Sequence, residues 1–122
     1  MRLFLFLLIV APSVALAQAG LKSSDIVLNQ SEMSELLSGT QLEFFDGSKS
    51  KYAADGSYAY TYTDDGPPWT GLYRVLDGSV VCVDFDNGSA RCDRLVRSGD
   101  RMVLIIEDGT RFPVRNLTVY NN

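Results

Sequence analysis

The sequence contains no histidine, and this absence excludes more chemistry than any other feature of its composition. Histidine supplies most general acid–base groups near neutral pH and many zinc and copper ligands. Ser-His-Asp and Cys-His catalysis are therefore excluded. Carboxylate pairs remain available, as in glycosidases, but no spacing singles out such a pair. The run Asp84-x-Asp86-Asn87-Gly88 does not match an EF-hand loop. We expect no enzymatic activity, no catalytic residues, no cofactor and no metal site.

Long apolar runs are absent after the first ten residues. Residues 3–10 are uniformly apolar and follow a positive Met1-Arg2, but they are too few to span a bilayer. Ala15-Leu16-Ala17 then provides the small-x-small pattern of a cleavage site. This order predicts a signal peptide at residues 1–17, with residue 19 as an alternative end. We expect a periplasmic or secreted protein without a membrane anchor after cleavage.

Positive charge is also scarce. The chain has 11 Lys and Arg against 15 Asp and Glu, so its net charge is −4. Nucleic acids and anionic lipids require clustered Lys and Arg, so we expect neither as the main partner. Most of the positive charge lies in the C-terminal half: Arg91, Arg94, Arg97, Arg101, Arg111 and Arg115. We interpret these arginines as scattered surface pairs, and the alternative is a positive binding face.

One short helix is predicted within a lead-in region at residues 18–39. Asn29 and Glu32 have the spacing of a capping box, and Gly39 stands where a helix C′ residue belongs. Three apolar residues follow the helical spacing: Met33, Leu36 and Leu37. The pattern predicts a helix at about 30–38, which is too short to be stable alone and docks through these three side chains.

The rest of the chain, residues 40–122, is predicted to be one β domain. Asx-Gly and related turns recur every 9 to 12 residues, at Gly47, Gly56, Gly66, Gly78, Gly88, Gly99 and Gly109. Asx-Gly is a strong hairpin signal because both residues tolerate positive φ. The fold class is therefore mainly β, with seven to eight antiparallel strands in a meander. We expect a small up-and-down barrel, because closure removes exposed edges. A two-sheet sandwich is the alternative.

Cys82 and Cys92 flank the turn Asp86-Asn87-Gly88. A three-residue hairpin loop at this turn places the two cysteines opposite each other on neighbouring strands. In an oxidising compartment such a pair forms a structural disulfide. A two-residue loop would instead place Val83 opposite Cys92, and the disulfide would exclude that register.

The candidate binding residues are aromatic. Tyr58, Tyr60 and Tyr62 alternate along a strand and therefore share one face. We interpret them as a core-facing row whose hydroxyls reach the rim, and the alternative is a surface for a bound ligand. Trp69 follows Pro67 and Pro68 in a stiff loop. We expect it to plug one end of the barrel, and the alternative is an exposed contact anchor.

Residues 102–106 are apolar on both faces of the expected strand. Such a strand needs cover on its outer face. We expect the N-terminal helix to supply this cover, and the alternative is a dimer interface.

Four short stretches resemble a group of small exported proteobacterial proteins of unknown function: residues 35–40, 52–56, 71–75 and 81–93. That pattern has a helix ending in Gly-x-Thr, a Gly-x-aromatic strand and a Cys-bearing hairpin. Where the group usually has Trp, this chain has Tyr73. The resemblance implies a periplasmic β-rich domain and no particular activity. A fainter likeness is to small exported β-barrel inhibitors of metalloproteases, which also carry one disulfide.

Two functions are consistent with these features. The first is a non-enzymatic protein-interaction or inhibitor-type domain that contacts another exported protein through the Trp69 loop. The second is a small-ligand carrier whose barrel interior is lined by Tyr58, Tyr60 and Tyr62.

Overall fold

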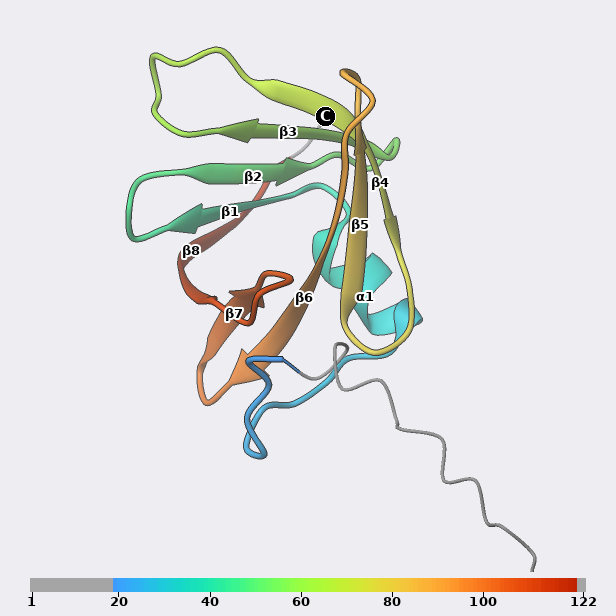
Figure 1. Ribbon diagram of the computed structural model, residues 1–122, viewed down its shortest axis with the longest axis vertical. Coiled ribbons are helices and arrows are strands. Elements are labelled where there is room, and N and C mark those ends of the chain that lie inside the picture. Colours follow the sequence, from blue (N-terminus) through green and yellow to red (C-terminus); the bar gives the residue numbers. More distant parts are fainter. Residues whose placement is uncertain (1–18, 121–122) are drawn as a thin grey trace, which may run out of the picture.

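The computed structural model describes residues 19–120 (Figure 1). The predicted signal peptide and its cleavage site at residue 17 lie outside these described residues. One helix, α1 (Gln30–Leu37), precedes eight strands. The strands are β1 (Thr40–Phe44), β2 (Lys49–Tyr52), β3 (Ser57–Thr61), β4 (Trp69–Val75), β5 (Val80–Phe85), β6 (Ala90–Ser98), β7 (Arg101–Ile105) and β8 (Arg111–Val119).

Every strand pairs antiparallel with its neighbour in sequence, and β8 pairs with β1 to close a barrel. The predicted up-and-down barrel of seven to eight strands is thus confirmed, with eight strands, and the sandwich alternative is wrong. Up-and-down connection places the turns after β1, β3, β5 and β7 at one end, which we call the open end. The turns after β2, β4 and β6 lie at the other end, which we call the helix end.

Helix α1 begins with the predicted capping box. The Asn29 side chain accepts a hydrogen bond from the Glu32 amide at 2.9 Å, and Glu32 Oε1 accepts one from the Asn29 amide at 3.0 Å. The helix ends before Gly39, whose φ of 71° is costly for other residues. Met33 and Leu37 are fully buried in the same core cluster as the barrel interior. The helix therefore packs across the helix end of the barrel (Figure 1).

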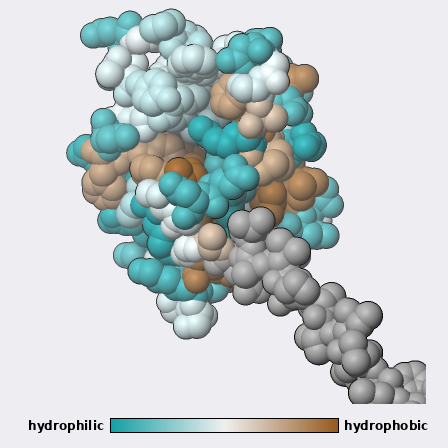
Figure 2. Space-filling model, in the orientation of Figure 1, coloured by the Kyte–Doolittle hydropathy of each residue, from teal (hydrophilic) through white to brown (hydrophobic). Residues whose placement is uncertain are grey.

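The barrel interior is filled by side chains from the helix and the strands. Its largest fully buried members are Tyr52, Tyr58, Met33, Leu37, Leu42 and Leu95. The ring of Tyr52 contacts those of Tyr58 and Tyr73 at centroid distances of 5.1 Å. Exposed apolar residues are separated into small patches among hydrophilic ones on the face that Figure 2 shows. No helix within residues 19–120 has the length and apolar character needed to cross a membrane.

The outer apolar face of β6 and β7 is covered by the lead-in segment, residues 19–28. Val96, Val103 and Ile105 form a second buried cluster, against which Leu21 packs. Ile26 and Arg97 pair through two backbone hydrogen bonds of 2.8 and 3.0 Å. The prediction that the helix covers the outer face of β7 is wrong, because α1 packs its apolar side chains into the barrel core instead.

Gly71 allows β4 and β5 to approach closely. A Cβ atom at this buried position would lie 2.2 Å from the carbonyl oxygen of Asp84 and 2.9 Å from the Cα of Phe85. Both are backbone atoms, which a rotamer change cannot move away. Only glycine therefore fits at this position, which lies beside the open end opposite Phe85.

Candidate functional site at the open end

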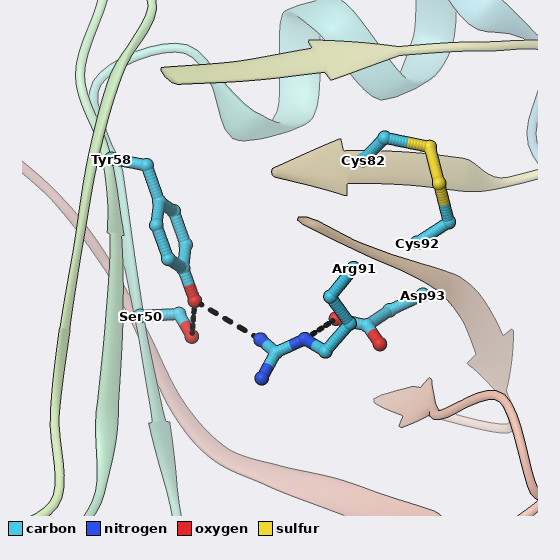
Figure 3. A network of polar contacts seen from close by, with 6 residues as sticks. All are labelled: Ser50, Tyr58, Cys82, Arg91, Cys92 and Asp93. Atoms are coloured by element: carbon cyan, nitrogen blue, oxygen red, sulfur yellow. Dashed lines mark hydrogen bonds and ion pairs between the residues drawn. A yellow bond between two sulfur atoms is a disulfide. The ribbon is translucent and has the colours of Figure 1, made fainter. Parts of the chain in front are cut away.

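The disulfide fixes the β5–β6 hairpin, which carries the most polar part of the interior. Cys82 and Cys92 are bonded and lie opposite each other with Cα atoms 4.0 Å apart. This confirms the predicted disulfide and the three-residue loop. Because side chains alternate along a strand, Arg91 and Asp93 point to the face opposite that of Cys92. The crosslink therefore lies outside the barrel and the two charged side chains lie inside (Figure 3).

The interior contains a chain of polar contacts from β6 to β2. The Arg91 Nε donates to Asp93 Oδ2 at 2.8 Å, and an Arg91 Nη donates to the Tyr58 hydroxyl at 3.3 Å. The Tyr58 hydroxyl also bonds to the Ser50 hydroxyl at 3.0 Å. Figure 3 shows the guanidinium lying between Tyr58 and Asp93. We call these four residues the interior polar cluster.

Asp93 is the least satisfied member of the interior polar cluster. Its side chain is 2% exposed, and its Oδ1 atom has no hydrogen-bond partner within the described residues. Burial raises the pKa of the Asp93 carboxyl, and the neighbouring Arg91 opposes that rise. Burial likewise raises the pKa of Tyr58. A buried acceptor without a donor is costly, so Oδ1 favours any group that can donate a hydrogen bond to it.

Aromatic rings surround the guanidinium where the cluster reaches the open end. The Arg91 Cζ lies 5.9 Å from the ring centroid of Tyr60 and 5.8 Å from that of Phe85. Tyr62 packs edge-on against Tyr60 with centroids 4.9 Å apart. Trp69 is the strand partner of Tyr60. We call Tyr60, Tyr62, Trp69 and Phe85 the aromatic rim.

The structure brings the sequence-predicted binding residues to this one region but gives them different environments. Tyr58 is buried, Tyr60 is half-buried, and Tyr62 is 63% exposed beyond the end of β3. Trp69 is 48% exposed. The prediction that Trp69 plugs the barrel is wrong. Trp69 is the first residue of β4, directly after the β3–β4 connection, and the interior nearby is occupied by Arg91, Tyr60 and Phe85.

A cavity of about 480 Å³ opens beside the interior polar cluster. It lies between the first half of β6 and the β7–β8 turn, because β7 pairs with β6 only from Arg94 onward. Arg91, Asp93 and Glu107 all line it. The Phe85 amide donates to the Ser89 carbonyl at 2.8 Å, which makes Phe85 and Ser89 a hydrogen-bonded pair. In the alternating pattern of an antiparallel ladder, the backbone groups of Ala90 and Cys92 then point away from β5, and both residues line this cavity.

Sequence reasoning missed Arg91 and Asp93 as interior residues. One signal was present: both residues have the same strand parity as the core residue Leu95, opposite to that of Cys92. As for metals, no three carboxylate or thiol side chains come together around a potential ion site in residues 19–120.

Comparison with protein-family models, with curated proteins and with solved structures finds no significant match. The resemblance to small exported proteobacterial proteins therefore stays a prediction. What the open end can do must be inferred from its own geometry: an aromatic rim beside the Arg91–Asp93 ion pair, with one buried acceptor left without a partner within the described residues.

Proposed function

We propose that this protein is an exported, non-enzymatic interaction domain that binds another protein through its open end. The observation that carries this proposal is the exposure of Tyr62 and Trp69, at 63% and 48%, on one hairpin. Trp and Tyr are enriched among residues that dominate binding energy, and exposed large aromatics cost solubility without a partner. The predicted signal peptide and the Cys82–Cys92 disulfide support an exported location.

The hairpin that presents these rings is held in place from both sides. The Lys49 ammonium donates to the Asp64 carboxylate at 2.6 Å, linking the β3–β4 connection to β2. The Thr70 hydroxyl donates to the Asp86 carboxylate, and the Asp86 amide donates to the Thr70 carbonyl at 3.0 Å. Pro67 and Pro68 stiffen the connection between them. A contact surface that is already ordered loses little entropy on binding.

The charge of the open end indicates the chemistry of the partner. Each of its four turns carries acidic residues: Asp46, Asp64, Asp65, Asp86, Glu107 and Asp108. Complementary charge raises association rates and excludes wrong partners. The partner is therefore a protein with a basic surface around an apolar contact that accepts Tyr62 and Trp69.

The small-ligand carrier remains the second candidate. The cavity of about 480 Å³ and the unpaired Oδ1 of Asp93 favour it. The sequence-based form of this hypothesis requires a barrel interior lined by three tyrosines. Tyr58 is instead packed in the core, so a ligand would have to enter beside Arg91 and Glu107.

Affinity capture with matched variants tests the proposal. The mature protein, immobilised, is incubated with periplasmic extract of its source cells, and captured proteins are identified by mass spectrometry. Y62A/W69A removes the exposed rings, and L72A is the control because Leu72 is equally exposed but faces the outer side of β4. We expect one dominant partner that L72A retains and Y62A/W69A loses by at least tenfold.

Two outcomes contradict the proposal. One is that no protein is enriched above an empty matrix, and the other is that both variants retain the partner equally. Native mass spectrometry of freshly purified protein distinguishes the carrier from the interaction domain. A bound small molecule that is lost in D93N favours the carrier, and a mass equal to that of the protein alone favours the interaction domain.

A further inference from the structure

A second opening lies at the helix end of the barrel, away from the aromatic rim. It is a cavity of about 290 Å³. Four apolar side chains contributed by α1, β7 and β8 line it, and we call them the floor: Leu36, Met102, Val114 and Leu117. Three arginines from β6, β7 and β8 line it as well: Arg97, Arg101 and Arg115.

The opening exists because β7 and β8 diverge toward the helix end. Their pairing covers only Val103 to Ile105 on β7, so Met102 has no strand partner on β8. Beyond this point β8 follows β1, and a register shift lies where Phe44 pairs with Val114 and Glu43 with Asn116. Arg115 is the extra residue of that bulge. Bulges commonly redirect a side chain, and here Arg115 lines the cavity.

The three arginines are not neutralised by neighbours. The ion pairs found in residues 19–120 use Lys49, Arg74, Arg91 and Arg111 as their cations. The guanidinium of Arg101 lies 4.9 Å from the ring centroid of Phe45, a contact that orients it without cancelling its charge. Asp100 also lines the cavity, but one carboxylate against three guanidinium groups leaves an excess of positive charge.

This excess stands out in a chain of net charge −4. The sequence-based interpretation of the C-terminal arginines is scattered surface pairs, but the two that are paired, Arg91 and Arg111, have buried partners in Asp93 and Asp25. That interpretation does not describe the three that meet here either. Guanidinium groups recognise carboxylates and phosphates through two parallel hydrogen bonds, and an apolar floor accepts hydrocarbon.

We propose that this cavity binds a small amphiphile with one anionic head group and a short apolar chain. Its head group contacts Arg97, Arg101 and Arg115, and its chain lies along the floor. The volume is at the small end of the range for ligand pockets, which suits a chain of up to about eight carbons and not a long lipid tail. The cavity shares no lining residue with the aromatic rim or with the interior polar cluster, although Arg101 contacts Phe45 of the β1–β2 turn. The proposal therefore goes beyond the proposed function and does not depend on it.

Calorimetric titration with three probes tests the chemistry. Octanoate combines the anion with the chain, 1-octanol carries the same chain without charge, and inorganic phosphate carries charge without a chain. We expect octanoate to bind one site per chain, at least tenfold more tightly than either of the other probes, and more weakly as salt is added. Failure of octanoate to bind at 10 mM, or equal binding of the three probes, overturns the proposal.

Two charge-matched variants locate the site. R101Q removes one positive charge from the cavity, and R94Q removes one from an arginine that lines the cavity at the open end instead. We expect R101Q to weaken octanoate binding at least fivefold and R94Q to leave it within twofold. Thermal melts check that both variants are folded, and R115Q repeats the test if R101Q is not. If R94Q lowers the affinity for octanoate as much as R101Q or R115Q does, the assignment is overturned.

Vesicles distinguish a soluble amphiphile from a membrane surface, which presents the same anionic head groups. The protein is floated with vesicles of phosphatidylglycerol and, as a control, of phosphatidylcholine. Octanoate binding without flotation supports the proposal. Flotation with phosphatidylglycerol in the absence of octanoate binding overturns it in favour of membrane-surface binding.

Discussion

The carboxylate of Asp25 and the guanidinium of Arg111 form a two-pronged ion pair, although 86 residues separate them in sequence. The two N–H···O distances are 2.6 and 2.9 Å, and the same guanidinium donates to the Gly20 carbonyl at 2.8 Å. The Asp25 side chain is 0% exposed. This ion pair fastens the lead-in segment to β8 and so holds the segment against the outer face of β7.

The variant R111M is expected to destabilise the protein strongly, because it leaves the Asp25 carboxylate buried without its cation. Breaking a buried ion pair from one side costs about 3 kcal/mol, whereas replacing both partners costs much less. Urea unfolding should therefore show a large loss in R111M and partial recovery in D25N/R111M. If the double variant is no more stable than R111M, the pair does not act as described.

Removing the disulfide is expected to lower the free energy of unfolding. A loop closed by a crosslink ten residues apart corresponds to roughly 2–3 kcal/mol in the chain-entropy description. The double variant C82A/C92A should therefore unfold at lower urea concentration and retain strand content by circular dichroism. Unchanged stability would show that the crosslink adds nothing to the hairpin register.

The variant G71A is expected to cost about 3 kcal/mol, at the upper end for overpacking, because the clashing atoms belong to the β5 backbone. G47A is the matched control. Gly47 also lies in the barrel, in a turn where a Cβ meets nothing within 4 Å, but its φ of 88° brings a smaller conformational cost. Thermal unfolding compares the two. A larger loss in G47A would contradict the close approach of β4 and β5.

The interior polar cluster predicts a specific pH dependence. The pKa of Asp93 is raised above its ordinary 3.8 by burial, so the folded protein holds this proton more tightly than the unfolded chain. The stabilising contribution of protonated Asp93 is therefore complete below pH 3.8, and it is lost as the pH rises through the raised pKa of the folded protein. Urea unfolding of wild type and D93N should show that wild type loses stability relative to D93N over that window. A relative gain with rising pH would contradict it.

The fold was predictable because its determinants are local. Asx-Gly turns such as Asn87-Gly88 fix where each hairpin reverses, and sequential pairing then determines the strand order. The helix was predictable for the same reason, since its capping residues and apolar spacing lie within ten residues. Only the choice between barrel and sandwich depends on a non-local contact, that of β1 with β8.

The parts that could not be predicted all depend on distant contacts. Trp69 is exposed because other side chains already fill the interior beside it, which no pattern near residue 69 reveals. The cover over β7 comes from the lead-in segment, and its anchor joins Asp25 to a residue near the other end of the chain. The convergence of Arg97, Arg101 and Arg115 likewise requires the divergence of β7 and β8.

The pairing of β8 with β1 gives the last part of the chain a role out of proportion to its length. Seven of the eight strand pairings join strands that follow each other directly, so each can form soon after its hairpin turn. The eighth must wait for residues 111–119, which also bring Arg111 to its partner. A chain cut short before them would leave β1 and β7 as unpaired edges and the lead-in segment unfastened, so incomplete copies should aggregate or be proteolysed while complete ones persist.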